Sequence, residues 1–176
     1  SENSHNFTIN HCKFTGNNVT DLTAGSGGAI DIDSDNNTIK NSNFTNNHAF
    51  YGGAICVGGD SGNTNITNVT FTGNGAYNDG GAVNLESSGA NLTDTRFYNN
   101  TASNNGGAVY VGGVGTTNVI FYSVFDNNEA GNRGGAIDWL AQKGEIKYSN
   151  LTRNSANNGG ALYLNGQATG SELSRL

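Results

Sequence analysis

The stretch FYNNTASNNGGAVYV, residues 97–111, contains two short motifs that decide the fold. The first is Phe-x-x-Asn (Phe97 and Asn100), and the second is Gly-Gly-Ala followed by an aliphatic residue. The second motif begins at Gly27, Gly52, Gly80, Gly106, Gly134 and Gly159, at steps of 25, 28, 26, 28 and 25 residues. A fixed period in this range is the signature of a stacked repeat array.

The Phe-x-x-Asn motif alternates with the Gly-Gly-Ala motif along the chain. It occurs as Phe14/Asn17, Phe44/Asn47, Phe71/Asn74, Phe97/Asn100 and Phe125/Asn128, with Leu151/Asn154 as a sixth copy. An aliphatic residue stands five positions before each copy, at Ile9, Ile39, Ile66, Leu92, Ile120 and Ile146. The first copy has extra residues before its Gly-Gly pair, so we expect an insertion at 18–26.

After each Gly-Gly-Ala, apolar side chains alternate with side chains that we expect to face outward, as in Val109-Tyr110-Val111 and Ile137-Asp138-Trp139. A period of two is typical of β-strands. One repeat is too small to bury its own apolar side chains, but stacking equivalent residues gives a continuous core, in which we expect Trp139 to lie. The sequence therefore predicts an all-β, right-handed parallel β-helix of about six coils, with two or three short strands in each.

An antiparallel sandwich of hairpins is the alternative fold. The dipeptides Asn74-Gly75, Asn105-Gly106 and Asn158-Gly159 are common in tight hairpin turns. Hairpins would not require one register of about 26 residues along the whole chain. The register therefore favours the β-helix.

Asparagine is unusually frequent, with 31 residues, and proline is absent. Central strands need every N–H in their ladder, which suits a chain without proline. Asparagine tolerates the left-handed backbone of sharp corners and forms hydrogen-bonded side-chain ladders. We expect the motif asparagines to form such a ladder beside the phenylalanines, in one domain over 1–176 with irregular ends at about 1–6 and 166–176. This domain is either a whole array or a segment of a longer one.

The paired motifs resemble the repeats of chlamydial polymorphic outer-membrane proteins. They are equally similar to the β-helical repeats of adhesin-like surface proteins of methanogenic archaea and other microbes. The resemblance rests on Gly27-Gly28-Ala29-Ile30 and its copies, together with Phe-x-x-Asn, and it covers about Ile9 to Leu164. It implies an extracellular passenger or stalk used in adhesion. It is less specific for activity, because the repeated residues are the ones that build the coil.

Composition excludes two classes of partner. The net charge is −6 with only eight Lys and Arg, whereas a sequence-independent nucleic-acid binder needs a basic face. No run of 18 apolar residues is present, so we expect no direct insertion into a membrane.

Three functions remain, and all are extracellular. The first is a non-catalytic cell-surface module, an adhesin-like stalk or binding segment, whose partner is a glycan or protein on another cell surface. The second is a structural subunit whose copies stack end to end into a filament or sheath. The third is a polysaccharide-active β-helix enzyme, a lyase or glycosidase.

Few residues support the hypothesis of a polysaccharide-active enzyme. Asp31 and Asp33 are expected to project outward, and Glu86 falls in the column of Asp33 two coils further on, while Asp138 lies four coils from Asp31. These carboxylates are scattered, whereas glycoside hydrolysis needs two that converge. No Arg or Lys occupies these columns to bind an acidic sugar. We therefore expect no catalytic residues.

The acidic run Asp31, Asp33 and Asp35 offers the hard oxygen ligands that Ca²⁺ prefers. It lacks the pattern of an EF-hand loop, because position six is Asn36 and position twelve is Ser42. The competing interpretation is a solvated acidic edge that discourages stray strand pairing. Calcium is the one candidate cofactor, and we otherwise expect none.

Two pairs of tyrosines form a candidate contact patch. Tyr110 and Tyr163 share the outward column of Asp31 and Asp138, and Tyr122 and Tyr148 are neighbours in another column. Stacking on neighbouring coils also gives a purely structural reason for them.

Cys12 and Cys56 are the only cysteines, and they lie on different types of strand about two coils apart. This separation exceeds the reach of a disulfide, so we expect two free thiols, with Cys12 facing inward.

Nine Asn-x-Ser/Thr sequons are candidate sites of N-glycosylation. They begin at Asn6, Asn18, Asn36, Asn43, Asn65, Asn68, Asn91, Asn99 and Asn150.

Overall fold

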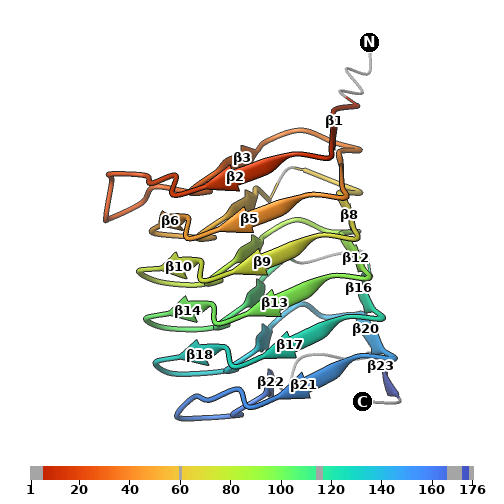
Figure 1. Cartoon of the computed structure of the whole chain (residues 1–176). Helices are drawn as coiled ribbons and strands as arrows, with labels where there is room; N and C mark the ends of the chain where they lie inside the picture. The colour runs from red at the N-terminus through yellow and green to blue at the C-terminus, as the bar shows by residue number, and fades with distance from the viewer. Residues whose placement is uncertain (1–5, 60, 114–116, 166–171, 175–176) are drawn as a thin grey trace.

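The chain winds into a stack of parallel coils along one axis (Figure 1). This computed structural model describes residues 6–59, 61–113 and 117–165 and the backbone of 172–174. All of its strand pairs are parallel, which confirms the β-solenoid and excludes the hairpin sandwich. Among the described residues, no helix is long and apolar enough to cross a membrane.

Three sheets run the length of the stack. The first has the order β1 (Thr8–Asn10), β4 (Thr38–Lys40), β8 (Asn65–Thr67), β12 (Asn91–Thr93), β16 (Asn118–Phe121), β20 (Gly144–Lys147) and β23 (Glu172–Ser174). The second has the order β2 (Lys13–Thr15), β5 (Asn43–Thr45), β9 (Thr70–Thr72), β13 (Arg96–Tyr98), β17 (Val124–Asp126) and β21 (Asn150–Thr152). The third consists of β3 (Ile30–Ile32), β7 (Ile55–Val57), β11 (Val83–Leu85), β15 (Val109–Val111), β19 (Ile137–Trp139) and β22 (Leu162–Leu164).

A fourth sheet was not predicted. It consists of the two-residue strands β6 (His48–Ala49), β10 (Gly75–Ala76), β14 (Thr101–Ala102) and β18 (Glu129–Ala130). Each strand buries one alanine, so the central coils have four strands rather than the expected two or three. Two residues are too short to show an alternating pattern, which explains the omission.

The predicted end segments need one correction. Residues 166–176 were expected to be irregular, but Glu172–Ser174 form β23 and pair in parallel with β20. The expected insertion at 18–26 forms the loop of the first coil, which extends further than the equivalent loops in Figure 1. Its two ends still join the stack through the bridges Asn18–His48 and Ser26–Tyr51.

Equivalent residues stack on one another, as the repeat predicts. Ile39 pairs with Ile66, Phe44 with Phe71, and Val83 with Val109. The rings of Phe14, Phe44, Phe71, Phe97 and Phe125 form one stack with centroid separations of 4.6–5.1 Å. Each fully buried phenylalanine contributes about 1.5–3 kcal/mol from burial alone. Trp139 is also buried in this core, as predicted.

The asparagine ladder is confirmed beside the phenylalanine stack. The backbone N and Nδ2 of Asn74 both donate to Oδ1 of Asn100, at 2.9 and 3.0 Å. Nδ2 of Asn74 also donates to the carbonyl of Phe44. The same pattern links Asn17, Asn47, Asn74, Asn100, Asn128 and Asn154. The ladder satisfies buried polar groups at the corner of every coil, which fixes the register of the coils.

Candidate functional site

The outer face of the third sheet carries a column of outward side chains in the predicted order. Asp31, Cys56, Asn84, Tyr110, Asp138 and Tyr163 are in register from coil to coil. This confirms that Tyr110 and Tyr163 share one column with Asp31 and Asp138. An outward position does not mean exposure here, because Cys56, Asn84 and Asp138 are all buried.

Arg133 is the residue that sequence reasoning missed on this face. Its Nη2 lies 3.3 Å from Oδ2 of Asp138, and its Cζ lies 4.9 Å from the ring centroid of Tyr163. Nε of Arg133 donates to Oδ1 of Asn105, and Nδ2 of Asn105 donates to Oδ1 of Asp79. The column of Asp31 and Asp138 itself holds no Arg or Lys, as expected. The long arginine side chain reaches it from the neighbouring column, just before a Gly-Gly pair.

Burial shifts the acidity of this face. It raises the pKa of Asp138 to about 6, since loss of solvation outweighs the attraction of Arg133. Loss of solvation also raises the pKa of Asp79 and of Glu86. The pKa of the Tyr110 hydroxyl is raised by burial first and by Glu86 second.

These carboxyl groups do not form a catalytic pair. The Asp138 side chain has no exposed surface, so it cannot touch a substrate in this arrangement. Glu86 belongs to the third coil and Asp138 to the fifth, about 10 Å apart by the strand spacing. The buried ion pair with Arg133 is a structural role for Asp138.

The acidic run near β3 is exposed but does not converge. Asp31, Asp33 and Asp35 are all exposed, and Oδ1 of Asp35 accepts a hydrogen bond from the Gly62 amide at 2.7 Å. Within the described ranges, no group of three or more His, Cys, Asp or Glu side chains could hold a metal ion. These three residues therefore do not form the coordination cluster that the calcium hypothesis requires.

Both cysteines are free thiols, as expected. Cys12 is partly buried, and its amide donates to Oγ of Ser42 at 3.0 Å. Burial, followed by the charge of Asp31, raises the pKa of Cys56 to about 11. A thiol with so high a pKa is a poor nucleophile at neutral pH.

Tyr122 and Tyr148 form an exposed aromatic pair. Their rings are parallel within 7° and 4.9 Å apart, and the residues are 58% and 45% exposed. Both have positive φ, 52° and 54°, in the left-handed region. Earlier coils place His11, Asn41, Asn68 and Asp94 at this corner with the same backbone. Histidine, asparagine and aspartate tolerate this conformation, whereas a bulky tyrosine there is an outlier.

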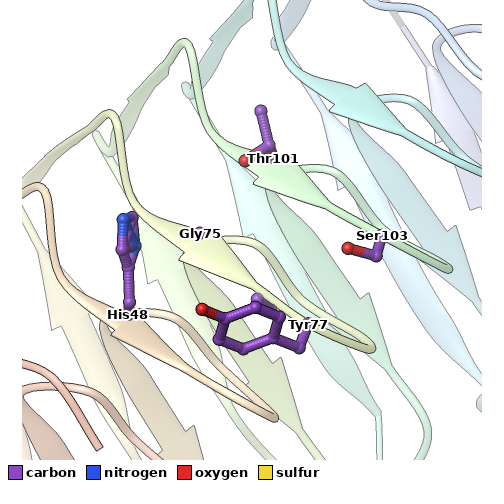
Figure 2. A pocket seen from close by; sticks show the side chains of 6 residues that line it. His48, Gly75, Tyr77, Thr101 and Ser103 are labelled. Carbon is purple, nitrogen blue, oxygen red and sulfur yellow. The ribbon is translucent and has the colours of Figure 1, made fainter. Parts of the chain in front are cut away.

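A second site was not predicted at all. A small pocket opens on the fourth sheet, and its lining is His48, Gly75, Ala76, Tyr77, Thr101 and Ser103. Figure 2 shows these side chains around Gly75. The period places His48, Gly75 and Thr101 one position after the motif asparagines, but the residue at this position differs from coil to coil, so it was not recognised as a site.

The sequons differ in accessibility. Asn6, Asn18, Asn36, Asn43, Asn68, Asn99 and Asn150 are exposed, whereas Asn65 and Asn91 are half-buried. Exposure does not mean a free amide in every case, because Nδ2 of Asn68 donates to Oδ1 of Asn41. Glycosylation at all nine stays a prediction.

Comparison with known families adds one finding. Residues 68–86, 94–112 and 122–138 match the model of the Chlamydia polymorphic membrane protein repeat. Three coils of this chain resemble polymorphic membrane protein repeats. Each matched segment runs from a Phe-x-x-Asn strand of the second sheet into the Gly-Gly-Ala strand of the third. No curated protein and no solved structure matches the chain.

Proposed function

We propose that this chain is an extracellular, non-catalytic cell-surface module, an adhesin-like stalk or binding segment. The match to polymorphic membrane protein repeats supports a surface-associated role. The side-chain ladders make the array rigid, because hydrogen bonds between asparagines join all six coils and stacked phenylalanine rings join the first five.

The exposed pair Tyr122 and Tyr148 carries this proposal. Left-handed backbone at a non-glycine residue costs about 1–2 kcal/mol, and an exposed aromatic ring recovers little by burial. The same corner holds asparagine at Asn41 and Asn68, so the fold accepts a residue with a lower conformational cost in the left-handed region. Two adjacent tyrosines at strained, exposed positions therefore favour a contact surface, since tyrosine is enriched in the central contacts of interfaces. Its partner is a glycan or protein on another cell.

A double variant tests this role. Tyr122→Asn combined with Tyr148→Asn installs the residue that the same corner uses in earlier coils, so folding and melting temperature should be preserved. We expect binding of the purified protein to host or neighbouring cells, measured by flow cytometry, to fall at least about tenfold. Tyr98→Thr is the matched control, because it removes a half-buried tyrosine from a column that holds Thr45 and Thr72. Unchanged cell binding by the double variant would contradict the proposal.

A structural subunit that stacks end to end is the alternative function. In the described part of the chain, β2 and β21 each pair on one side only, and open strand edges are templates for further pairing. Stacking of copies in one direction would give an open filament. Sedimentation velocity over a hundredfold concentration range and negative-stain microscopy test it, since a monomer at every concentration removes this alternative.

A further inference from the structure

The pocket in Figure 2 exists because one side chain is absent from a column. Gly75 lies between His48 and Thr101 in the fourth sheet. A Cβ at Gly75 would lie 3.0 Å from Nδ1 of His48 and 3.4 Å from Oγ1 of Thr101. Any side chain at this position would therefore crowd His48 and Thr101, and glycine keeps the position between them clear.

The polar groups around this space are uncharged hydroxyls and an imidazole. Figure 2 shows the oxygens of Thr101 and Ser103 on the side that faces Gly75. Nδ1 of His48 lies 3.0 Å from the Asn47 carbonyl and donates to it, which leaves Nε2 as an acceptor. The pocket thus offers both donors and acceptors.

The charge of the surroundings limits the ligand class. No lysine, arginine or carboxylate is among the six lining residues. Glu129 follows Thr101 in the same column and is exposed, so it disfavours an anionic group nearby. A single imidazole is also too few ligands for a metal ion. An uncharged ligand with several hydroxyl groups fits best.

The size of the pocket and the aromatic ring of Tyr77 restrict the class of ligand further. The pocket has a volume of about 180 Å³, below the roughly 300–1,000 Å³ of pockets that enclose a drug-sized ligand. Tyr77 is 52% exposed and contributes an apolar ring with a polar tip. A pyranose ring has hydroxyl edges and an apolar face of C–H bonds, which matches hydroxyls on one side and a tyrosine on the other.

We propose that the pocket over Gly75 binds one uncharged pyranose residue of a cell-surface glycan. This inference rests on the proposed function for the source of the glycan, but it concerns a different face from Tyr122 and Tyr148. Gly75 provides the space, Tyr77 provides the apolar wall, and Thr101, Ser103 and His48 bind the hydroxyls.

An array of immobilised neutral, sialylated and sulfated oligosaccharides tests the pocket. Gly75→Thr fills the space with the residue that the next coil already has at this position. We expect the wild type to bind neutral glycans and Gly75→Thr to bind them at least about tenfold more weakly. Gly59→Ala is the control, since its Cβ would meet nothing closer than 3.8 Å. Tyr77→Phe, which keeps the wall and loses the hydroxyl, should have a smaller effect than Tyr77→Ala.

Amide chemical shifts locate the contact independently of affinity. Titration with glucose, galactose and N-acetylglucosamine should shift the amides of Gly75 and Ala76 and leave those near Tyr148 unchanged. Glycan binding that Gly75→Thr does not weaken, binding of anionic glycans alone, or no glycan binding at all would each overturn this inference. The cell-binding assay of the tyrosine double variant decides the proposed function separately in all three cases.

Discussion

At the scale of single residues, the buried asparagines of the Phe-x-x-Asn motif each have a fixed partner in the neighbouring coil. Asn100 shows this most clearly, since its Oδ1 accepts from both N and Nδ2 of Asn74 and its own N and Nδ2 donate to Asn128. Its Nδ2 also donates to the carbonyl of Phe71. The ladder links neighbouring coils by hydrogen bonds that water cannot replace at a buried site.

Replacement of Asn100 by alanine should therefore be costly. Asn100→Ala leaves buried donors of Asn74 without an acceptor, and each unsatisfied group costs about 1–3 kcal/mol. We expect a loss of about 3–5 kcal/mol in the free energy of unfolding, measured by urea denaturation. Asn154→Ala should cost less, because Asn154 is the half-buried last residue of the ladder and its truncation opens the donors of Asn128 to water. Equal losses for both variants would argue against a cooperative ladder.

Asp138 should make stability depend on pH in the opposite sense to an ordinary surface aspartate. Its pKa is raised from 3.8 to about 6 in the folded state, so its stabilising contribution is complete below pH 4 and is lost as the pH rises through 6. Asp138→Asn removes this dependence, so the unfolding free energy of the variant should fall less than that of the wild type between pH 4 and pH 7. Glu86 and Asp79 titrate in the wild type and in the variant alike. The informative quantity is therefore the difference in unfolding free energy between pH 4 and pH 7, compared between the wild type and Asp138→Asn.

Asp126 is the matched control for that measurement. Hydrogen bonds from Arg153 and Thr152 lower its pKa, so its contribution is present above pH 4 and is lost as the pH falls. Asp126→Asn should therefore leave the difference between pH 4 and pH 7 nearly unchanged, because this carboxyl titrates below pH 4. A change as large as that of Asp138→Asn would show that burial does not dominate at Asp138.

At the scale of elements, the Gly-Gly-Ala strands require glycine for contact between coils. A Cβ on Gly81 would lie 2.0 Å from the carbonyl oxygen of Gly107 and 2.5 Å from that of Thr101. Both atoms belong to the backbone, so no side chain can move to make room. Gly81→Ala should lower the unfolding free energy by about 3 kcal/mol or more, measured by thermal and urea denaturation, whereas Gly59→Ala should change it little. A small effect of Gly81→Ala would mean that the coils can separate locally.

The elements also show which features a sequence pattern can predict. The phenylalanine stack, the asparagine ladder and the column of Tyr110 and Tyr163 follow from the period, because equivalent positions must stack. The burial of Asp138 does not follow from the period. Arg133 covers Asp138 from an adjacent column, and the period does not predict how far a long side chain reaches. The pocket at Gly75 does not follow from the period either, because it depends on the one coil that has glycine in a column of larger residues.

At the scale of the whole molecule, each coil contacts only the coils next to it, so one complete coil should be removable. Deletion of residues 80–105 joins Asp79 to Gly106, and Phe71 and Asn74 then meet Phe125 and Asn128 in place of Phe97 and Asn100. We expect the shortened chain to keep its β-sheet circular dichroism and a cooperative melting transition at lower temperature, because one interface between coils is lost. Deletion of residues 80–92 removes half a coil and places strands of different sheets on one another, so this control should fail to fold. An unfolded product from the full-coil deletion, or equal behaviour of the two, would show that the stack depends on contacts beyond nearest neighbours.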